Sequence, residues 1–335
     1  MTVRRPAVAG SFYPAGEAEL KEAVDGSYLH RLGPGRLPPL IAPGPAPNLR
    51  ACVCPHAGYA YSGPTAAHSF LDISQLDAPE LVVVVGPNHY GVGSGVATFG
   101  EGEWETPLGN VRVDRDASKR IVELADLVEV DPEAHRREHS IEVQLPFLQR
   151  IYGSSFSVLP ISLAFQHKAI ARDLGKGLAS LLEEAAEADL RAVLIASSDL
   201  THYESAPQAR EKDAALLKHV ERLDLDAFYT TLERRNVTAC GYGAIATVME
   251  ACRLLGFVRG RVNAYATSGD VTGENEAVVG YPSVSFLERL VPAPSFPALS
   301  LTNFLRSLAR ISCSSAVNAS SDSWRDSLYP VRTLS

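Results

Sequence analysis

The chain has 335 residues, of which 46% are hydrophobic and 21% charged, with a formal net charge of −8. This balance is typical of a globular protein with a buried core, and the lack of a basic tract argues against a nucleic-acid partner. No apolar run reaches the ~20 residues of a membrane helix, and the start lacks the apolar region of a signal peptide. We therefore expect a cytoplasmic protein with no membrane partner.

Hydrophobic patterning predicts helices that alternate with strands along the chain. In order, the expected elements are helix 17–31, strand 49–54, helix 63–73, strand 81–85, helices 115–126 and 139–152, strand 156–163, helix 167–186, strand 191–196, helices 207–221, 224–234 and 241–256, and strands 260–267 and 277–287. The Pro- and Gly-rich segment 33–48 is expected to be an irregular loop. Because the strand segments are continuously apolar, both of their faces should be covered, which predicts a layered α/β domain with a parallel or mixed sheet.

The composition changes after about residue 290. The segment VPAPSFPALS reads as a linker, and Leu301, Phe304, Leu305 and Leu308 then fall on one face of a short helix that Ser300 can cap. The rest is Ser-rich and aperiodic, so we expect it to be disordered. The predicted domains are therefore an α/β domain at 1–290, then a linker, a short helix and a disordered tail at 291–335.

Polar residues follow three of the predicted strands. His56 comes after strand 49–54, His89 after strand 81–85, and Asp199 and His202 after strand 191–196. Ligands of open α/β sheets bind beyond the carboxyl ends of the strands. The positions therefore predict that these side chains share one rim of the sheet.

The cysteines are five in number and irregularly spaced, so the sequence does not predict a disulfide framework. Cys240 comes just before the helix predicted from residue 241, where a thiol is expected to have a lowered pKa and to act as a ligand or nucleophile. Cys52 and Cys54 are expected on alternate faces of their strand, and therefore in the core. His139 and Glu142 are expected in the first turn of helix 139–152.

Each of these residues alone is better explained as an ordinary core, cap or loop residue, and only their common rim favours a shared site. Two imidazoles and one thiolate, from His56, His89 and Cys240, suit zinc, copper or iron. Alternatively, Cys240 is the nucleophile of a metal-free site with a histidine as base.

Proton transfer is expected of the residues beside the metal ligands. Asp199 and His202 are predicted to form a proton-transfer pair in which the carboxylate fixes the tautomer of the imidazole. His139 is a further candidate acid or base, or a hydrogen-bond donor of the pocket.

Seven segments in this order resemble the Memo family, which in prokaryotes is called AmmeMemoRadiSam system protein B. They are RPAVAGSFYPA, PHAGYAYSGPTAAH, GPNHYG, EHSIEVQLPFLQ, ASSDLTHYE, TACGYGAI and YATSGDVTG, spanning about residues 4 to 288. The resemblance implies a fold similar to that of class III extradiol dioxygenases, a layered mixed sheet with helices on both faces. Ring-cleaving activity should not be inherited from that fold.

The resemblance also implies the site. His56, His89 and Cys240 match the family's metal ligands, Asp199 and His202 match its neighbouring pocket residues, and Phe12 and Tyr61 line the same cleft, where we also place Glu142. The implied cofactor is iron or copper, with zinc as an alternative.

The implied function is that of a metal-dependent oxidoreductase or oxygenase-like enzyme for an unidentified small-molecule or peptide ligand. The family's prokaryotic name further implies a link to a radical SAM protein and to AmmeMemoRadiSam protein A. The alternative from another class is a binding module for a peptide or anionic ligand. That alternative predicts paired arginines after the SSD segment, where the chain has Arg210 alone.

Overall fold

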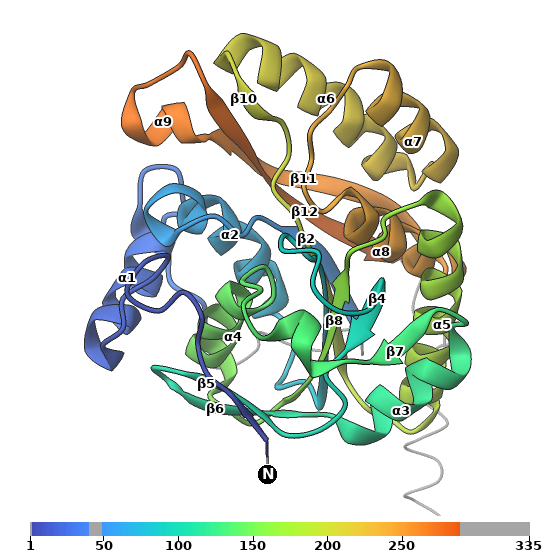
Figure 1. Cartoon of the computed structure of the whole chain (residues 1–335). Helices are drawn as coiled ribbons and strands as arrows, with labels where there is room; N and C mark the ends of the chain where they lie inside the picture. Colours follow the sequence, from blue (N-terminus) through green and yellow to red (C-terminus); the bar gives the residue numbers. More distant parts are fainter. Residues whose placement is uncertain (1, 40–48, 289–335) are drawn as a thin grey trace, which may run out of the picture. The chain divides into compact units, whose positions relative to one another are not determined.

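A computed structural model of the chain describes residues 2–39 and 49–288, and the account below concerns these residues. The described elements in chain order (Figure 1) are β1 Val3–Arg4, α1 Glu17–Leu29, β2 Leu49–Cys54, α2 Tyr59–Ile73, β3 Leu81–Pro87, β4 Val96–Thr98, β5 Glu103–Thr106, β6 Gly109–Val113, α3 Arg115–Leu124, β7 Val128–Val130, α4 Leu145–Tyr152, β8 Ser157–Leu163, α5 Lys168–Glu187, β9 Ala192–Ser197, β10 His202–Glu204, α6 Ala206–Arg222, α7 Leu225–Arg234, α8 Tyr242–Leu254, β11 Phe257–Thr267, α9 Ser268–Thr272 and β12 Val278–Glu288. Short 3₁₀ turns cover Pro132–His135 and Glu142–Gln144.

The strands of the described residues form one mixed sheet of twelve. Its main path runs β1-β5-β6-β8-β3-β9-β2-β12-β10, while β11 pairs with β12, and β4 with β7 and β8. The central strands β8, β3, β9 and β2 are all parallel. On the far side of β2, β12 runs antiparallel to β2, and β11 antiparallel to β12. The parallel block therefore ends in an antiparallel edge.

Both faces of the central strands are buried. In β3, Val82 and Val84 belong to an apolar layer shared with α1, α2 and α4, whereas Val83 and Val85 belong to a layer shared with α3, α5, α7 and α8. Figure 1 shows α1, α2 and α4 on one side of these strands and α5 and α8 on the other. This alternation is the period-2 geometry of a strand covered twice. It confirms the predicted α/β class, with a layered mixed sheet and helices on both faces.

Two predicted helices begin elsewhere. α2 begins at Tyr59 rather than at residue 63, so Pro64 lies inside the helix, where it cannot donate a backbone hydrogen bond. The helix predicted at 139–152 begins as α4 only at Leu145, with a proline in its first turn, where proline is favoured. His139 therefore lies in a loop, and its predicted place in the first helical turn is wrong.

Cys52 and Cys54 lie on the same face of β2, not on alternate faces. Residues two apart on a strand share a face, and the two Sγ atoms are 3.6 Å apart. Both side chains are buried, as expected, in the apolar layer beneath α2.

Some predictions fall outside the described residues. Most of the loop 33–48 and the whole of the predicted segment 291–335 belong to this group. Among the residues that the structure describes, no helix combines the length and the apolar character needed to cross a membrane.

Candidate metal centre

Three candidate residues follow three adjacent strands. β2, β9 and β3 are neighbours and run parallel, so their carboxyl ends lie side by side. β2 ends at Cys54, β3 at Pro87 and β9 at Ser197, so His56, His89 and Asp199 each come two residues after a strand end. The structure therefore brings together the residues that the sequence places at a common rim.

Cys240 reaches this rim from the amino end of α8. Gly241 allows the approach, since a Cβ there would lie 2.4 Å from the Ser197 carbonyl oxygen and 2.8 Å from Ser198 Cβ. The Gln166 side chain donates to the Cys240 carbonyl at 2.8 Å. As a result, Cys240 Sγ lies 3.1 Å from His56 Nε2.

The nitrogen and sulfur atoms of His56, His89 and Cys240 lie within 4.8 Å of one another. Such a set of two imidazoles and one thiol suits a transition metal. Asp199 and His202 form a second group with the same Cys240 sulfur, again within 4.8 Å. The two groups therefore share the Cys240 sulfur.

A third geometric group, made of His89, Glu138 and His139, is a poorer metal site. Glu138 Oε1 accepts from His89 Nδ1 and from the backbone amides of His139 and Ser140, and Oε2 accepts from the His89 amide. These hydrogen bonds use the lone pairs of the carboxylate. Glu138 therefore orients the loop and the His89 ring instead of offering a free ligand atom.

Burial controls the protonation of the innermost pair. His56 is 2% exposed, and burial, followed by the nearby His139 and His89, holds its pKa well below the usual value. Burial and then the charge of Asp199 raise the pKa of the Cys240 thiol. The predicted lowering of this thiol pKa is wrong for the metal-free chain, because loss of water outweighs the helix end. Without metal, a neutral thiol faces a neutral imidazole.

Asp199 does not orient His202 as predicted. The Nδ1 of His202 lies 2.6 Å from the Leu200 carbonyl oxygen and 3.0 Å from that of Thr238, so backbone atoms fix the ring. Asp199 instead accepts a hydrogen bond from the backbone amide of His56 at 2.9 Å. Burial raises the pKa of Asp199 to about 6, which leaves it able to exchange a proton near neutral pH.

His139 packs against the ring of a metal-ligand candidate. Its ring stacks on His89 with centroids 4.6 Å apart, and Phe12 covers it at the same centroid distance. Burial lowers the pKa of His139 to about 4, so the ring is neutral at pH 7. A neutral imidazole in this position can form a hydrogen bond with a ligand, but its lowered pKa makes it a weak base.

Glu142, expected in the substrate cleft, is instead fully buried. It forms an ion pair with Arg4 and accepts hydrogen bonds from the amides of Ala7 and Val8 and from the Tyr13 hydroxyl. Its carboxylate therefore ties the amino-terminal segment to the rest of the fold, and direct contact with a substrate would require these bonds to break. Glu142 therefore lies near the site in a structural role.

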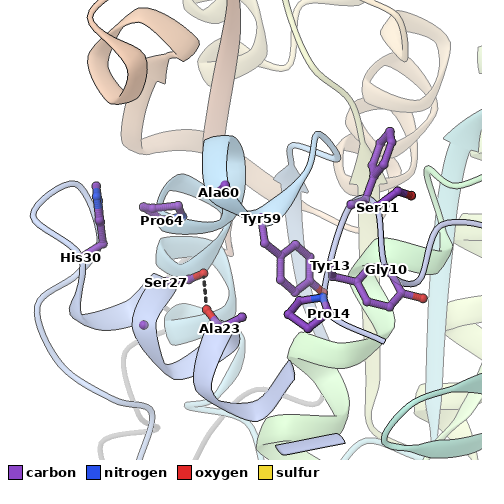
Figure 2. Close-up of a pocket in the computed structure, with 12 residues that line it drawn as sticks. Gly10, Ser11, Tyr13, Pro14, Ala23, Ser27, His30, Tyr59, Ala60 and Pro64 are labelled. Atoms are coloured by element: carbon purple, nitrogen blue, oxygen red, sulfur yellow. Dashed lines mark hydrogen bonds between the residues drawn. The ribbon is translucent and has the colours of Figure 1, made fainter. Parts of the chain in front are cut away.

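A pocket of about 480 Å³ opens beside the amino-terminal loop (Figure 2). Phe12 lines it together with Tyr13, Tyr59 and Pro64, but Tyr61, which is 46% exposed, does not. The Tyr59 hydroxyl donates to the Val143 carbonyl and the Tyr13 hydroxyl to Glu142, so both hydroxyls are engaged by the protein. The pocket is therefore mainly apolar, and Phe12 links it to His139.

Sequence reasoning missed the residues that support the ligands from behind. Ser197, Gln144 and Glu138 all contact the candidate ligand histidines or their hydrogen-bond partners. Their signal is weak, because a buried serine at a strand end and a glutamine in a helical pattern are common. Glu138 alone had a signal, since it directly precedes His139.

Comparison with known proteins decides the family. A sequence model described as Memo-like protein matches residues 4–285. The chain belongs to the Memo family. A MEMO1 family protein of Nitrosopumilus maritimus is 44% identical over 285 residues, which are 85% of this chain and 100% of the relative. A MEMO1 family protein of Aeropyrum pernix is 47% identical over 284 residues, covering 85% and 99% of the two chains.

One solved structure resembles this Memo family chain more distantly. An uncharacterized Escherichia coli K12 protein aligns with a TM-score of 0.47 and 17% identity, over 70% of this chain and 98% of its own. That likeness is too remote to bear on function, so the site must be argued from its own residues.

The alternative anion-binding role finds no support at its predicted arginine. Arg210 donates to both carboxylate oxygens of Asp270, at 2.7 and 2.5 Å, and its guanidinium lies over the Tyr265 ring. Its charge is therefore already paired within the protein.

Proposed function

We propose that this Memo family chain is a metal-dependent oxidoreductase or oxygenase-like enzyme. His56, His89 and Cys240 would hold iron or copper, with zinc as the alternative. The observation that supports this is the convergence of these three ligand atoms within 4.8 Å at the carboxyl edge of the sheet. Residues 184 positions apart in the chain meet there, which an ordinary core or loop role does not require.

The thiolate distinguishes this donor set from one with a carboxylate. Sulfur is the softer ligand and favours metals such as copper and iron. When bound, the metal would supply electron transfer and Lewis acidity. The chain's own part is to bind, to orient and to move protons.

Asp199 and His202 are the proposed proton carriers. Asp199, with its pKa near 6, can give or take a proton at neutral pH. The Nε2 of His202 is left for the centre because its Nδ1 faces two carbonyl oxygens. His139 is the proposed hydrogen-bond donor of the pocket beside them. The apolar pocket at Phe12 is the proposed place for the apolar part of a small-molecule or peptide ligand.

Metal content of anaerobically purified protein tests the proposal. We expect wild type to retain about one metal per chain, and His89→Ala to lose most of it. His68→Ala is the matched control, because His68 is a half-buried histidine bonded to the Leu32 carbonyl. Equal metal in wild type and His89→Ala would rule out the ligand set.

A metal-free cysteine enzyme is the second candidate. It is favoured by the 3.1 Å separation of Cys240 Sγ and His56 Nε2, which is close enough for a base to activate a nucleophile. Alkylation of Cys240 separates the two candidates. If Cys240 binds a metal, alkylation should be slow in the protein as purified and faster after chelation. If Cys240 is a metal-free nucleophile, it should react at the same rate before and after chelation.

A further inference from the structure

Behind the candidate ligands lies a set of buried hydrogen bonds that face away from the centre. We propose that Ser197 and Glu138 are positioning residues that fix His56 and His89 in the Nδ1–H tautomer, so that both Nε2 atoms present a lone pair to the centre before any metal binds. His202 is fixed in the same form by backbone carbonyls. The inference concerns the metal-free protein and rests on the proposed metal site only for its effect on affinity.

The hydrogen-bond pattern around Ser197 determines the tautomer of His56. The Ser197 hydroxyl has one proton, and it donates that proton to the Ser140 carbonyl at 2.6 Å. Its oxygen accepts a hydrogen bond from the Gln144 side-chain amide at 2.9 Å. The same oxygen lies 2.9 Å from His56 Nδ1. Ser197 has no second proton to give, so His56 Nδ1 must be the donor. Nε2 is then unprotonated and accepts from the Cys240 thiol.

The orientation of the Gln144 amide supports this assignment. Its Nε2 also lies 3.0 Å from the Pro55 carbonyl oxygen, which can only accept a proton. The amide group therefore points its two protons at Pro55 and Ser197. All five residues of the network are buried, so water does not offer the serine another partner.

Glu138 determines the tautomer of His89 in a simpler way. Its Oε1 lies 2.9 Å from His89 Nδ1 and already accepts two backbone amides. A carboxylate in such surroundings is an acceptor, and Nδ1 must donate. Carboxylates that hold a metal-binding histidine in this way also raise its basicity.

His202 follows the same rule, since carbonyl oxygens of Leu200 and Thr238 both lie next to its Nδ1. Three imidazoles from three segments are thus fixed with Nε2 unprotonated. Hydrogen-bond acceptors of the protein, and not a property of the ring itself, set the tautomer at all three positions. The ligands are arranged for binding in advance, which lowers the free energy that metal binding must spend on orienting them.

Long-range ¹H–¹⁵N spectra of the metal-free protein at pH 8 test the proposal, with peaks assigned from single histidine variants. We expect protonated Nδ1 and unprotonated Nε2 at His56, His89 and His202. His68 is the internal control, because its Nε2 faces the Leu32 carbonyl and should carry the proton. An Nε2–H form at His56 or His89 would overturn the proposal.

Ser197→Ala tests the positioning role directly. Without the hydroxyl, His56 should shift toward the Nε2–H tautomer, and metal affinity should fall about 10- to 100-fold. Ser69→Ala is the matched control, since Ser69 is equally buried and its hydroxyl bonds to the Val53 carbonyl and to Ser283, not to a histidine. Its tautomers and affinity should equal those of wild type. An unchanged His56 in folded Ser197→Ala would contradict the role.

Glu138→Gln gives a second, milder test. The glutamine carbonyl can take the place of Oε1, while its NH₂ group replaces Oε2 and loses the hydrogen bond from the His89 amide. His89 should therefore keep its tautomer while losing this bond and the neighbouring charge. The variant should bind metal more weakly than wild type, and loss of the tautomer would argue against the assignment. If the tautomers are found but metal does not bind, the proposed function fails and this inference stands. If metal binds to histidines of mixed tautomer, this inference fails alone.

Discussion

Single buried charges and polar groups determine how the amino-terminal segment and the site fit together. Arg4 and Glu142 are 4% and 0% exposed, and the pair links the first strand to the turn before α4. Breaking a buried ion pair from one side leaves an uncompensated charge. Such residues stabilise the site without contacting its ligand.

We predict that Glu142→Ala lowers the free energy of unfolding by about 3–5 kcal/mol. The double variant Arg4→Met/Glu142→Leu should recover part of that loss, because it removes both charges at once but leaves the amides of Ala7 and Val8 and the Tyr13 hydroxyl without their acceptor. Urea unfolding of the three proteins measures this. A fully stable Glu142→Ala that binds ligand poorly would favour the original expectation that Glu142 contacts substrate.

A buried histidine outside the site should make stability depend on pH. His135 is 0% exposed beside Phe99 and Trp104, and burial lowers its pKa to about 3. Since the folded pKa lies below the unfolded value near 6.5, its contribution is complete above pH 6.5 and is lost as pH falls toward 3. Between pH 7 and pH 4, the free energy of unfolding of wild type should therefore fall by up to about 3 kcal/mol more than that of His135→Phe. Equal losses would contradict the assigned pKa shift.

The elements show which parts of the fold follow from local sequence. Continuously apolar segments such as 81–85 predicted the central strands, because burial on both faces leaves that pattern. The short strands β1, β4, β5, β6, β7 and β10 were missed, since two to five residues show no periodicity. Strand ends predicted the rim residues His56, His89 and Asp199. The supporting contacts of Ser197 and Glu138 depend on tertiary packing, which no local pattern records.

Gly241 tests how tightly α8 must approach β9. The backbone oxygen that a Cβ would meet cannot move aside, so we expect Gly241→Ala to cost about 1–3 kcal/mol and to weaken metal binding by displacing Cys240. Gly26→Ala is the control, because Gly26 lies inside α1 with no atom within 4 Å of the added Cβ. Alanine there should stabilise the protein by about 0.5–1 kcal/mol. Thermal unfolding and metal titration of both variants check this, and an unaffected Gly241→Ala would contradict the close approach.

At the scale of the molecule, β12 completes the sheet. It pairs with β2, β11 and β10 and ends at Glu288. The region that matches the family ends at residue 285, inside this strand. The strand at the end of this shared region is therefore part of the core assembly.

We predict that a chain ending at Arg289 keeps the melting temperature and metal content of the full chain. A chain ending at Thr267 should fail to fold, because it lacks β12 and exposes the edge of β2. Circular dichroism and metal analysis of both truncations provide the test. A large loss of stability on ending at Arg289 would contradict the predicted division near residue 290.

X-ray absorption at the metal edge of anaerobically purified protein tests the central claim most directly. The proposed ligands predict one sulfur and at least two imidazole nitrogens around the metal in wild type, and loss of the sulfur in Cys240→Ala. A first shell without sulfur in wild type, or an unchanged sulfur signal in Cys240→Ala, would contradict a centre made by His56, His89 and Cys240.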